Sequence, residues 1–224
     1  MSVLADQFTA HTFVDAFRFI GDNASLMLSK TGQTCELAFA ALGIALALAL
    51  PLGLWLGHRH RGLFLALGVS TLGRALPIIV LIAFGLTVLG VGFWNNTAAL
   101  VVLGIPPILT NAYFAVDGAD RDAVEAARGM GLTERQVLLR IELPLGLPLI
   151  VAGVRISAVF VIASATIAAI AGGGGLGDII VNQASYGLAG VIAGSLCVSA
   201  VALLTALALG LVHRAVSRST TARA

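Results

Sequence analysis

Long apolar stretches, separated by short polar segments, make up most of the chain between residues 33 and 211. A helix needs about 20 apolar residues to cross the ~30 Å hydrocarbon core of a bilayer. Five stretches meet this length: residues 33–57, 75–93, 97–116, 147–171 and 188–211. The pattern therefore predicts an all-α integral membrane protein with five transmembrane helices.

A sixth apolar segment, residues 62–73, is too short to cross alone. A crossing at this point would reverse the orientation of every later span. We interpret the segment as an elbow that lies at the membrane interface and leads into the second span.

The basic residues set the orientation. With the N-terminus outside, eleven of the 13 Lys and Arg residues lie on or near the cytoplasmic side, and only Arg18 and Lys30 lie outside. Cytoplasmic loops carry the excess of basic residues in membrane proteins. The predicted topology is therefore N-out/C-in, with an external segment 1–32 and a cytoplasmic tail 212–224. The eleven are Arg59, Arg61, Arg74, Arg121, Arg128, Arg135, Arg140, Arg155, Arg214, Arg218 and Arg223.

Composition agrees with a membrane protein and excludes an ordinary soluble domain. Hydrophobic residues make up 58% of the chain and charged residues 11%, whereas soluble domains carry about 25% charged residues. Cys35 and Cys197 lie singly in apolar runs, which is typical of small buried thiols. Because no nucleophile–base pair or metal-like spacing is present, we expect no catalytic site, no metal site and no nucleic-acid partner.

The largest polar segment, residues 117–146, lies between the third and fourth predicted spans. It holds six of the 11 acidic residues and four arginines. Asp120 or Asp122 suits the N-cap of a first short helix, and glycines 129 and 131 end it. This helix would present small apolar residues and a glutamate on one side, which suits a groove on a partner protein. A pair of amphipathic helices lying on the membrane surface is the alternative interpretation.

A second short helix follows in the same segment. Thr133 and Gln136 have capping-box spacing, and the apolar residues after them predict a helix that Pro144 stops.

Seven residues of this segment share one fixed spacing. They are a glutamate with two alanines, a glycine after three further residues, an isoleucine after nine more, and a closing leucine–proline pair: Glu125, Ala126, Ala127, Gly131, Ile141, Leu143 and Pro144. This set resembles the EAA motif of ABC importer permeases at full spacing. The resemblance implies that the first four form a turn that docks into a cytoplasmic ATPase. It implies that the last three anchor the return to the membrane.

The resemblance extends over roughly residues 33–211. Residues 74–77, 107–113, 125–132 and 172–178 are similar to permeases for glycine betaine, carnitine, choline and related osmoprotectants, within the methionine-permease-like fold. It implies that residues 1–224 form a single permease domain in a bacterial cytoplasmic membrane. A methionine or amino-acid importer is the alternative substrate class.

The same resemblance implies a set of partners. They are a pair of cytoplasmic ATPases that bind ATP and Mg²⁺, a second copy or a paralogous permease, an extracytoplasmic substrate-binding protein and the lipid bilayer. This chain would bind no cofactor and would not hydrolyse ATP itself. A secondary transporter or channel would instead carry ionisable residues at mid-membrane and internal repeats, which are not found in the sequence. A non-transporting membrane anchor is a third possibility.

Several small or polar residues are candidates for the translocation path or its gate. Polar side chains in spans line a path or hydrogen-bond one helix to another, and both interpretations stay open here. The glycine run at residues 172–175 predicts a flexible, close-packed turn on the outer face and a candidate gate. The candidates are Pro77, Asn111, Ser164, Thr166, Gly173, Gly174 and Gly175.

Overall fold

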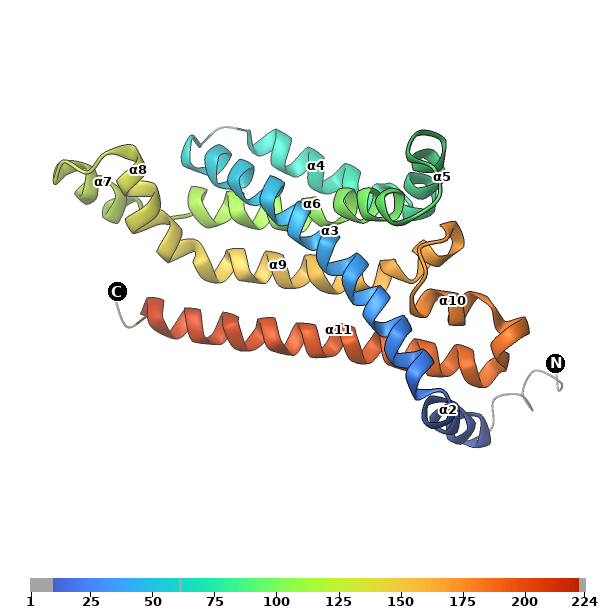
Figure 1. Ribbon diagram of the computed structural model, residues 1–224. Helices are drawn as coiled ribbons and strands as arrows, with labels where there is room; N and C mark the ends of the chain where they lie inside the picture. Colours follow the sequence, from blue (N-terminus) through green and yellow to red (C-terminus); the bar gives the residue numbers. More distant parts are fainter. Residues whose placement is uncertain (1–9, 61, 222–224) are drawn as a thin grey trace.

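The computed structural model describes residues 10–60 and 62–221, which form an elongated bundle of helices (Figure 1). Residues 1–9 of the predicted external segment, Arg61, and residues 222–224 of the predicted tail, with Arg223, lie outside the described residues. The helices are α2 (Ala10–Asp22), α3 (Ala24–His58), α4 (Leu63–Ala75), α5 (Ile78–Leu89), α6 (Phe93–Asp117), α7 (Arg121–Gly129), α8 (Glu134–Val137), the π turn η1 (Leu138–Glu142), α9 (Leu143–Ala165), the 3-10 turn η2 (Ile167–Ala171), α10 (Leu176–Val181) and α11 (Gln183–Thr221).

Four helices in the described part of the chain are long and apolar enough to span a membrane: Ala24–His58, Phe93–Asp117, Glu134–Ala165 and Gln183–Arg218. They coincide with the first, third, fourth and fifth predicted spans. All-helical membrane architecture is therefore confirmed, although the fourth span ends in the 3-10 turn η2 rather than as one helix to residue 171.

The second predicted span differs from the prediction. Residues 75–93 do not form one helix: α4 ends at Ala75, and α5 covers only 12 residues. Pro77 explains the break, because proline disfavours helical geometry in the residue before it and has no N–H to donate. Pro77 is extended, with φ −64° and ψ 131°, and its carbonyl accepts the first hydrogen bond of α5, from Val80 N–H.

Residues 62–73 are not an interfacial elbow. They form most of α4, which lies alongside α6, while α5 turns across the end of the bundle (Figure 1). Ala66 is fully buried, and the Thr110 hydroxyl donates to its carbonyl at 3.5 Å. Gly73 packs directly on the ring of Pro106. The helix is therefore part of the packed bundle.

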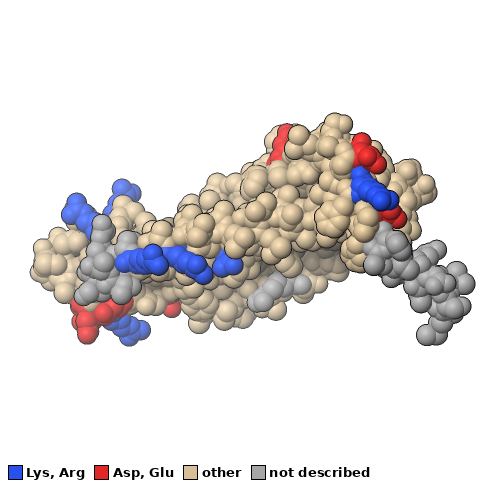
Figure 2. All heavy atoms as spheres, turned by 90° about the horizontal axis from the view of Figure 1, so that it is seen from below, with Lys and Arg blue, Asp and Glu red and all other residues tan. Residues whose placement is uncertain are grey.

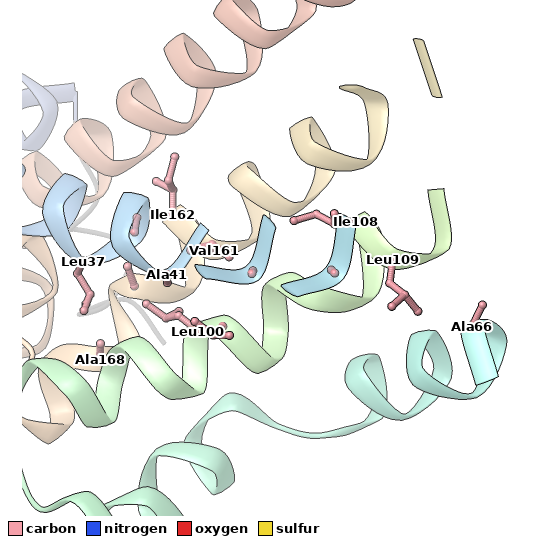
Figure 3. Packing of buried hydrophobic residues seen from close by; sticks show 14 of the residues in the cluster. Leu37, Ala41, Ala66, Leu100, Ile108, Leu109, Val161, Ile162 and Ala168 are labelled. Atoms are coloured by element: carbon pink, nitrogen blue, oxygen red, sulfur yellow. The ribbon is translucent and has the colours of Figure 1, made fainter. Parts of the chain in front are cut away.

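The core lies where α3, α6 and α9 meet, joined by α4 and η2. Figure 3 shows Leu37 and Ala41 of α3, Leu100 and Ile108 of α6, and Val161 and Ile162 of α9 converging there, with Leu109, Ala66 and Ala168 around them. Small residues recur on the side of α3 that faces α6, and Gly53 and Gly57 are two of them. A Cβ on Gly53 would lie 2.7 Å from the Leu109 carbonyl, and one on Gly57 would lie 2.5 Å from the Tyr113 carbonyl. Small residues spaced by four allow helix backbones to touch in a membrane.

Charged groups gather at the two ends of the bundle. The end that carries α7, α8 and the C-terminus is called the loop end, and the end that carries α2, α5 and α10 is called the far end (Figure 1). Figure 2 shows most of the Lys, Arg, Asp and Glu side chains toward the two ends, with a row of basic side chains that runs from the loop end toward the middle of this face. At the far end Lys30 pairs with Asp178 at 2.5 Å, which ties α3 to α10. This distribution agrees with helices that cross an apolar layer.

Candidate coupling site

The first loop helix, α7, is capped by hydrogen bonds at both ends. The Asp120 carboxylate accepts from the Asp122 N–H at 3.0 Å, which confirms Asp120 as the N-cap. At the other end, Gly131 has φ +84°, a left-handed conformation. The Gly131 N–H donates to the Arg128 carbonyl at 2.9 Å, and the Leu132 N–H donates to the Ala127 carbonyl at 3.2 Å. Together these bonds form a Schellman motif, which reverses the chain sharply.

The second loop helix packs back on the first. Gln136 Oε1 accepts from the Thr133 N–H at 2.9 Å, as the predicted capping box requires. Three buried residues, Val124, Ala127 and Val137, form a small core between the two helices. Partly buried residues surround it: Ala119, Leu132 and Ile141. The loop is therefore a compact unit with its own apolar centre.

This packing divides the EAA-like residues into two groups. Ala127 faces inward and is 1% exposed, so its methyl group packs in the apolar centre of the loop. Glu125 and Ala126 face outward, next to Gly129 and Met130. Met130 is 73% exposed, which is unusual for a large apolar side chain. We call Glu125, Ala126, Gly129 and Met130 the docking face.

Met130 is not one of the seven motif residues found in the sequence. Its position four residues after Ala126 places both on one helical face, and this spacing was the available signal.

Pro144 does not stop the second loop helix, contrary to the sequence prediction. The chain continues from α8 through η1 into α9, and Pro144 stands in the first turn of α9. In η1 the Leu143 N–H donates to the Leu138 carbonyl, one residue further back than in an α-helix. This wider turn just before Pro144 accommodates a residue that lacks an N–H. Leu143 packs partly buried on Ala112, Ala115 and Ile150.

A chain of polar contacts joins this loop to the loop end of α3. Glu142 is 1% exposed, and His58 Nδ1 lies 2.6 Å from its Oε2. His58 Nε2 lies 3.2 Å from Glu134 Oε2, which also accepts from Arg128 Nη2 at 3.1 Å. Two residues further on, His60 Nδ1 lies 2.8 Å from Asp117 Oδ1.

The sequence alone does not reveal the contacts of His58 and His60. Their partners are more than 50 residues away in the chain, so no local pattern revealed them. In the described residues, no group of three or more His, Cys, Asp or Glu side chains is arranged to hold a metal ion.

Two of the candidate path residues, Asn111 and Thr166, make local hydrogen bonds. Asn111 Nδ2 donates to the Pro107 carbonyl within α6 at 2.7 Å, and the hydroxyl of Thr166, the C-cap of α9, donates to the Ala163 carbonyl at 2.8 Å. Ser164 is partly buried, and Pro77 is exposed at the start of α5. Their role in a path stays a prediction.

The glycine run at 172–175 packs closely against α3 and α6. Gly174 and Gly175 have φ of +68° and +78°. Gln33 Oε1 accepts from the Gly175 N–H, and the Thr34 hydroxyl accepts from the Leu176 N–H, both at 2.9 Å. A Cβ on Gly173 would lie 2.8 Å from Asn96 Nδ2. The turn is thus hydrogen-bonded to the far end of α3, and a gating role stays a prediction.

The Schellman turn offers a matched pair of variants. We expect Gly131→Ala to loosen the loop, because an L-residue in the left-handed region costs about 1 kcal/mol. Trypsin should then cleave at the loop arginines about fivefold faster. Gly129→Ala is the control, since Gly129 has a helical backbone and open space around it. Equal cleavage rates of the two variants would contradict the assigned turn.

Comparisons with known proteins agree on one family. Residues 49–220 match the family described as binding-protein-dependent transport system inner membrane component. The carnitine transport permease protein OpuCB of Listeria monocytogenes is 35% identical, covering 86% of this chain and 88% of that protein. The glycine betaine/carnitine/choline transport system permease protein OpuCB of Bacillus subtilis is 32% identical, covering 89% and 92%. The MetNI methionine ABC transporter, solved in an inward-facing conformation, superposes with a TM-score of 0.74 at 21% identity, covering 85% and 96%.

Proposed function

The chain belongs to the family of binding-protein-dependent transport system inner membrane components, and from this premise we propose that it is the permease subunit of an osmoprotectant importer. The solute would be a small quaternary amine such as glycine betaine, carnitine or choline. The observation that carries this proposal is the 35% identity to a carnitine permease over 88% of that protein's length. A separate binding protein would deliver the solute at the far end.

ATP would act through the loop between α6 and α9. The docking face offers two small residues, a carboxylate and an exposed methionine on a compact, capped helix. Such a face suits a groove on an ATPase, because small residues allow close approach and Met130 adds apolar contact area. Two ATPases, each bound to one permease, would draw the two loops together when they close on ATP.

A second permease would pack beside this one. Only 6% of the residues in the apolar stretch of α11 are buried. Four of its leucines are each more than 60% exposed: Leu203, Leu204, Leu207 and Leu211. Such a helix suits contact with lipid and with a second copy or a paralogue. Osmoprotectant permeases with paired names, OpuCB and OpuCD, occur among the relatives of the chain.

Methionine is the second candidate substrate, and the likeness to the MetNI transporter motivates it. That likeness is at 21% identity, so it supports the fold rather than the substrate. Three relatives at 31–35% identity are named for carnitine, glycine betaine or choline.

Uptake in proteoliposomes tests the substrate class. The vesicles would contain this chain, its co-purifying ATPase, any partner permease and the binding protein, with labelled glycine betaine, carnitine, choline and methionine offered in parallel. We expect ATP-dependent accumulation of at least one quaternary amine and none of methionine. Methionine uptake would overturn the substrate class and keep the mechanism. Uptake without ATP would overturn the proposal as a whole.

A further inference from the structure

Two histidines at the loop end of α3 reach both places where the loop joins the bundle. The loop leaves α6 at Asp117, which faces His60 at 2.8 Å. It returns into α9 at Glu142, which faces His58 at 2.6 Å. We call His58, His60, Asp117 and Glu142 the histidine clasp. The clasp joins the loop end of α3 to the segments where α6 ends and α9 begins.

The stronger arm of the clasp is built around a buried charge. Glu142 is 1% exposed, and a buried carboxylate is costly unless it is paired and hydrogen-bonded. His58 is its only ion-pair partner among the described residues. The second ring nitrogen of His58 faces Glu134. The His58 ring therefore lies between the carboxyl groups of Glu142 and Glu134, and it joins α3, α8 and η1 at one point.

The backbone supports the second arm. His60 has φ +47°, the one non-glycine residue with a positive φ in the described part of the chain. This conformation is uncommon outside glycine, and a residue held in it indicates a constraint from its surroundings. Between the two histidines, Arg59 turns the other way and stacks over the Trp55 ring at 5.2 Å. The chain thus directs both imidazoles, and not the intervening arginine, toward the loop.

The end of α3 is itself firmly attached to α6. Gly57, next to His58, allows direct contact with the Tyr113 carbonyl, one turn before Asp117. A group bonded to His58 or His60 is therefore held relative to two spans and not to a free helix end.

We propose that the histidine clasp makes the loop and the first long helix move as one body, so that a displacement of the loop is passed to α3, α6 and α9 together. His58 and His60 are thus positioning residues, which act through Asp117 and Glu142. The role of this link in transport rests on the proposed function. The link itself is a property of this chain and can be measured without a partner.

Spin-label distances test the link without any transport assay. Nitroxide labels would be placed on Met130 and on Leu48 of α3, both exposed, after replacement of Cys35 and Cys197. In the purified permease in lipid nanodiscs, we expect one narrow distance distribution. In the double variant His58→Ala/His60→Ala, the distribution should broaden or split. An unchanged width in a correctly folded double variant would overturn the clasp.

A second measurement separates positioning from a purely structural role. In the complete transporter we expect His58→Ala/His60→Ala to raise the ATP hydrolysed per solute imported by about tenfold, because the loop can move without the spans. His60→Asn should stay within about twofold of the wild type, since asparagine keeps a hydrogen-bond donor and tolerates a left-handed backbone. An unchanged ATP-to-solute ratio in the double variant would overturn the clasp.

Folding and the proposed function are controlled separately. If the double variant does not fold, Glu142→Gln replaces it, because glutamine keeps the shape of the side chain and a hydrogen bond to His58 but carries no charge. We expect its spin-label distance distribution to be broader than that of the wild type and narrower than that expected for the double variant. Should the wild-type transporter import nothing with ATP, the proposed function fails while the spin-label result still decides the clasp.

Discussion

Glu125→Lys is expected to abolish ATP-driven uptake while the permease still inserts and folds. Glu125 is exposed on α7 and makes no ion pair among the described residues, so its replacement should cost the isolated chain little. In a groove that accepts a carboxylate, however, a lysine would face cationic or desolvated polar groups. Mispairing of a buried interface charge costs about 2–5 kcal/mol. Uptake should therefore fall at least about thirtyfold, together with ATPase co-purification.

A matched control makes this result specific. Asp15→Lys changes the net charge by the same amount at the far end, where Asp15 is exposed and forms only a 3.7 Å contact with Arg18. It should leave ATPase binding and uptake near wild type. Normal uptake by Glu125→Lys, or an equal loss in Asp15→Lys, would sink the assignment of the docking face.

The second large effect is expected where α3 crosses α6. In Gly57→Leu the added side chain begins 2.5 Å from the Tyr113 carbonyl and 3.1 Å from Val116 Cβ, both parts of a packed helix. The helices must separate, and overpacking of a core costs about 1–3 kcal/mol. For a chain of this length that is a fall of roughly 2–12 °C in Tm, measured in detergent. Because Gly57 adjoins His58, uptake should fall as well.

Gly43 on the same helix provides the comparison. It is exposed, and a Cβ there would meet nothing within 4 Å. Gly43→Leu should therefore leave Tm unchanged. If both leucine variants melt at the same temperature, close contact at Gly57 is not what holds α3 on α6.

Much of the fold could be predicted from hydropathy, because a membrane forces each crossing to be a long apolar helix. This constraint correctly located α3, α6, α9 and α11. It failed at residues 62–93, where Pro77 divides one apolar stretch into α4 and α5. Hydropathy does not distinguish a broken helix from a continuous one, and the burial of Ala66 against α6 is a tertiary property.

The loop shows the same division between local and distant effects. Its two caps, at Asp120 and Thr133, follow from short-range hydrogen bonds that the sequence encodes within a few residues. The inward position of Ala127 depends on how the two loop helices fold together, and the contacts of His58 and His60 depend on how distant segments meet. A motif spacing shows which residues belong together, but not which of them face a partner.

The π turn at η1 gives a geometric meaning to the motif spacing. An α-helix advances about 100° around its axis for each residue, and α8, η1 and α9 run on without a break. Loss or gain of one residue among 138–142 would therefore swing α7 and Glu125 about a quarter of a circle around the α9 axis. The number of residues between Gly131 and Ile141 therefore sets the direction in which α7 points around the α9 axis. A one-residue insertion or deletion here would therefore turn Glu125 away from its present direction without altering any residue of the docking face.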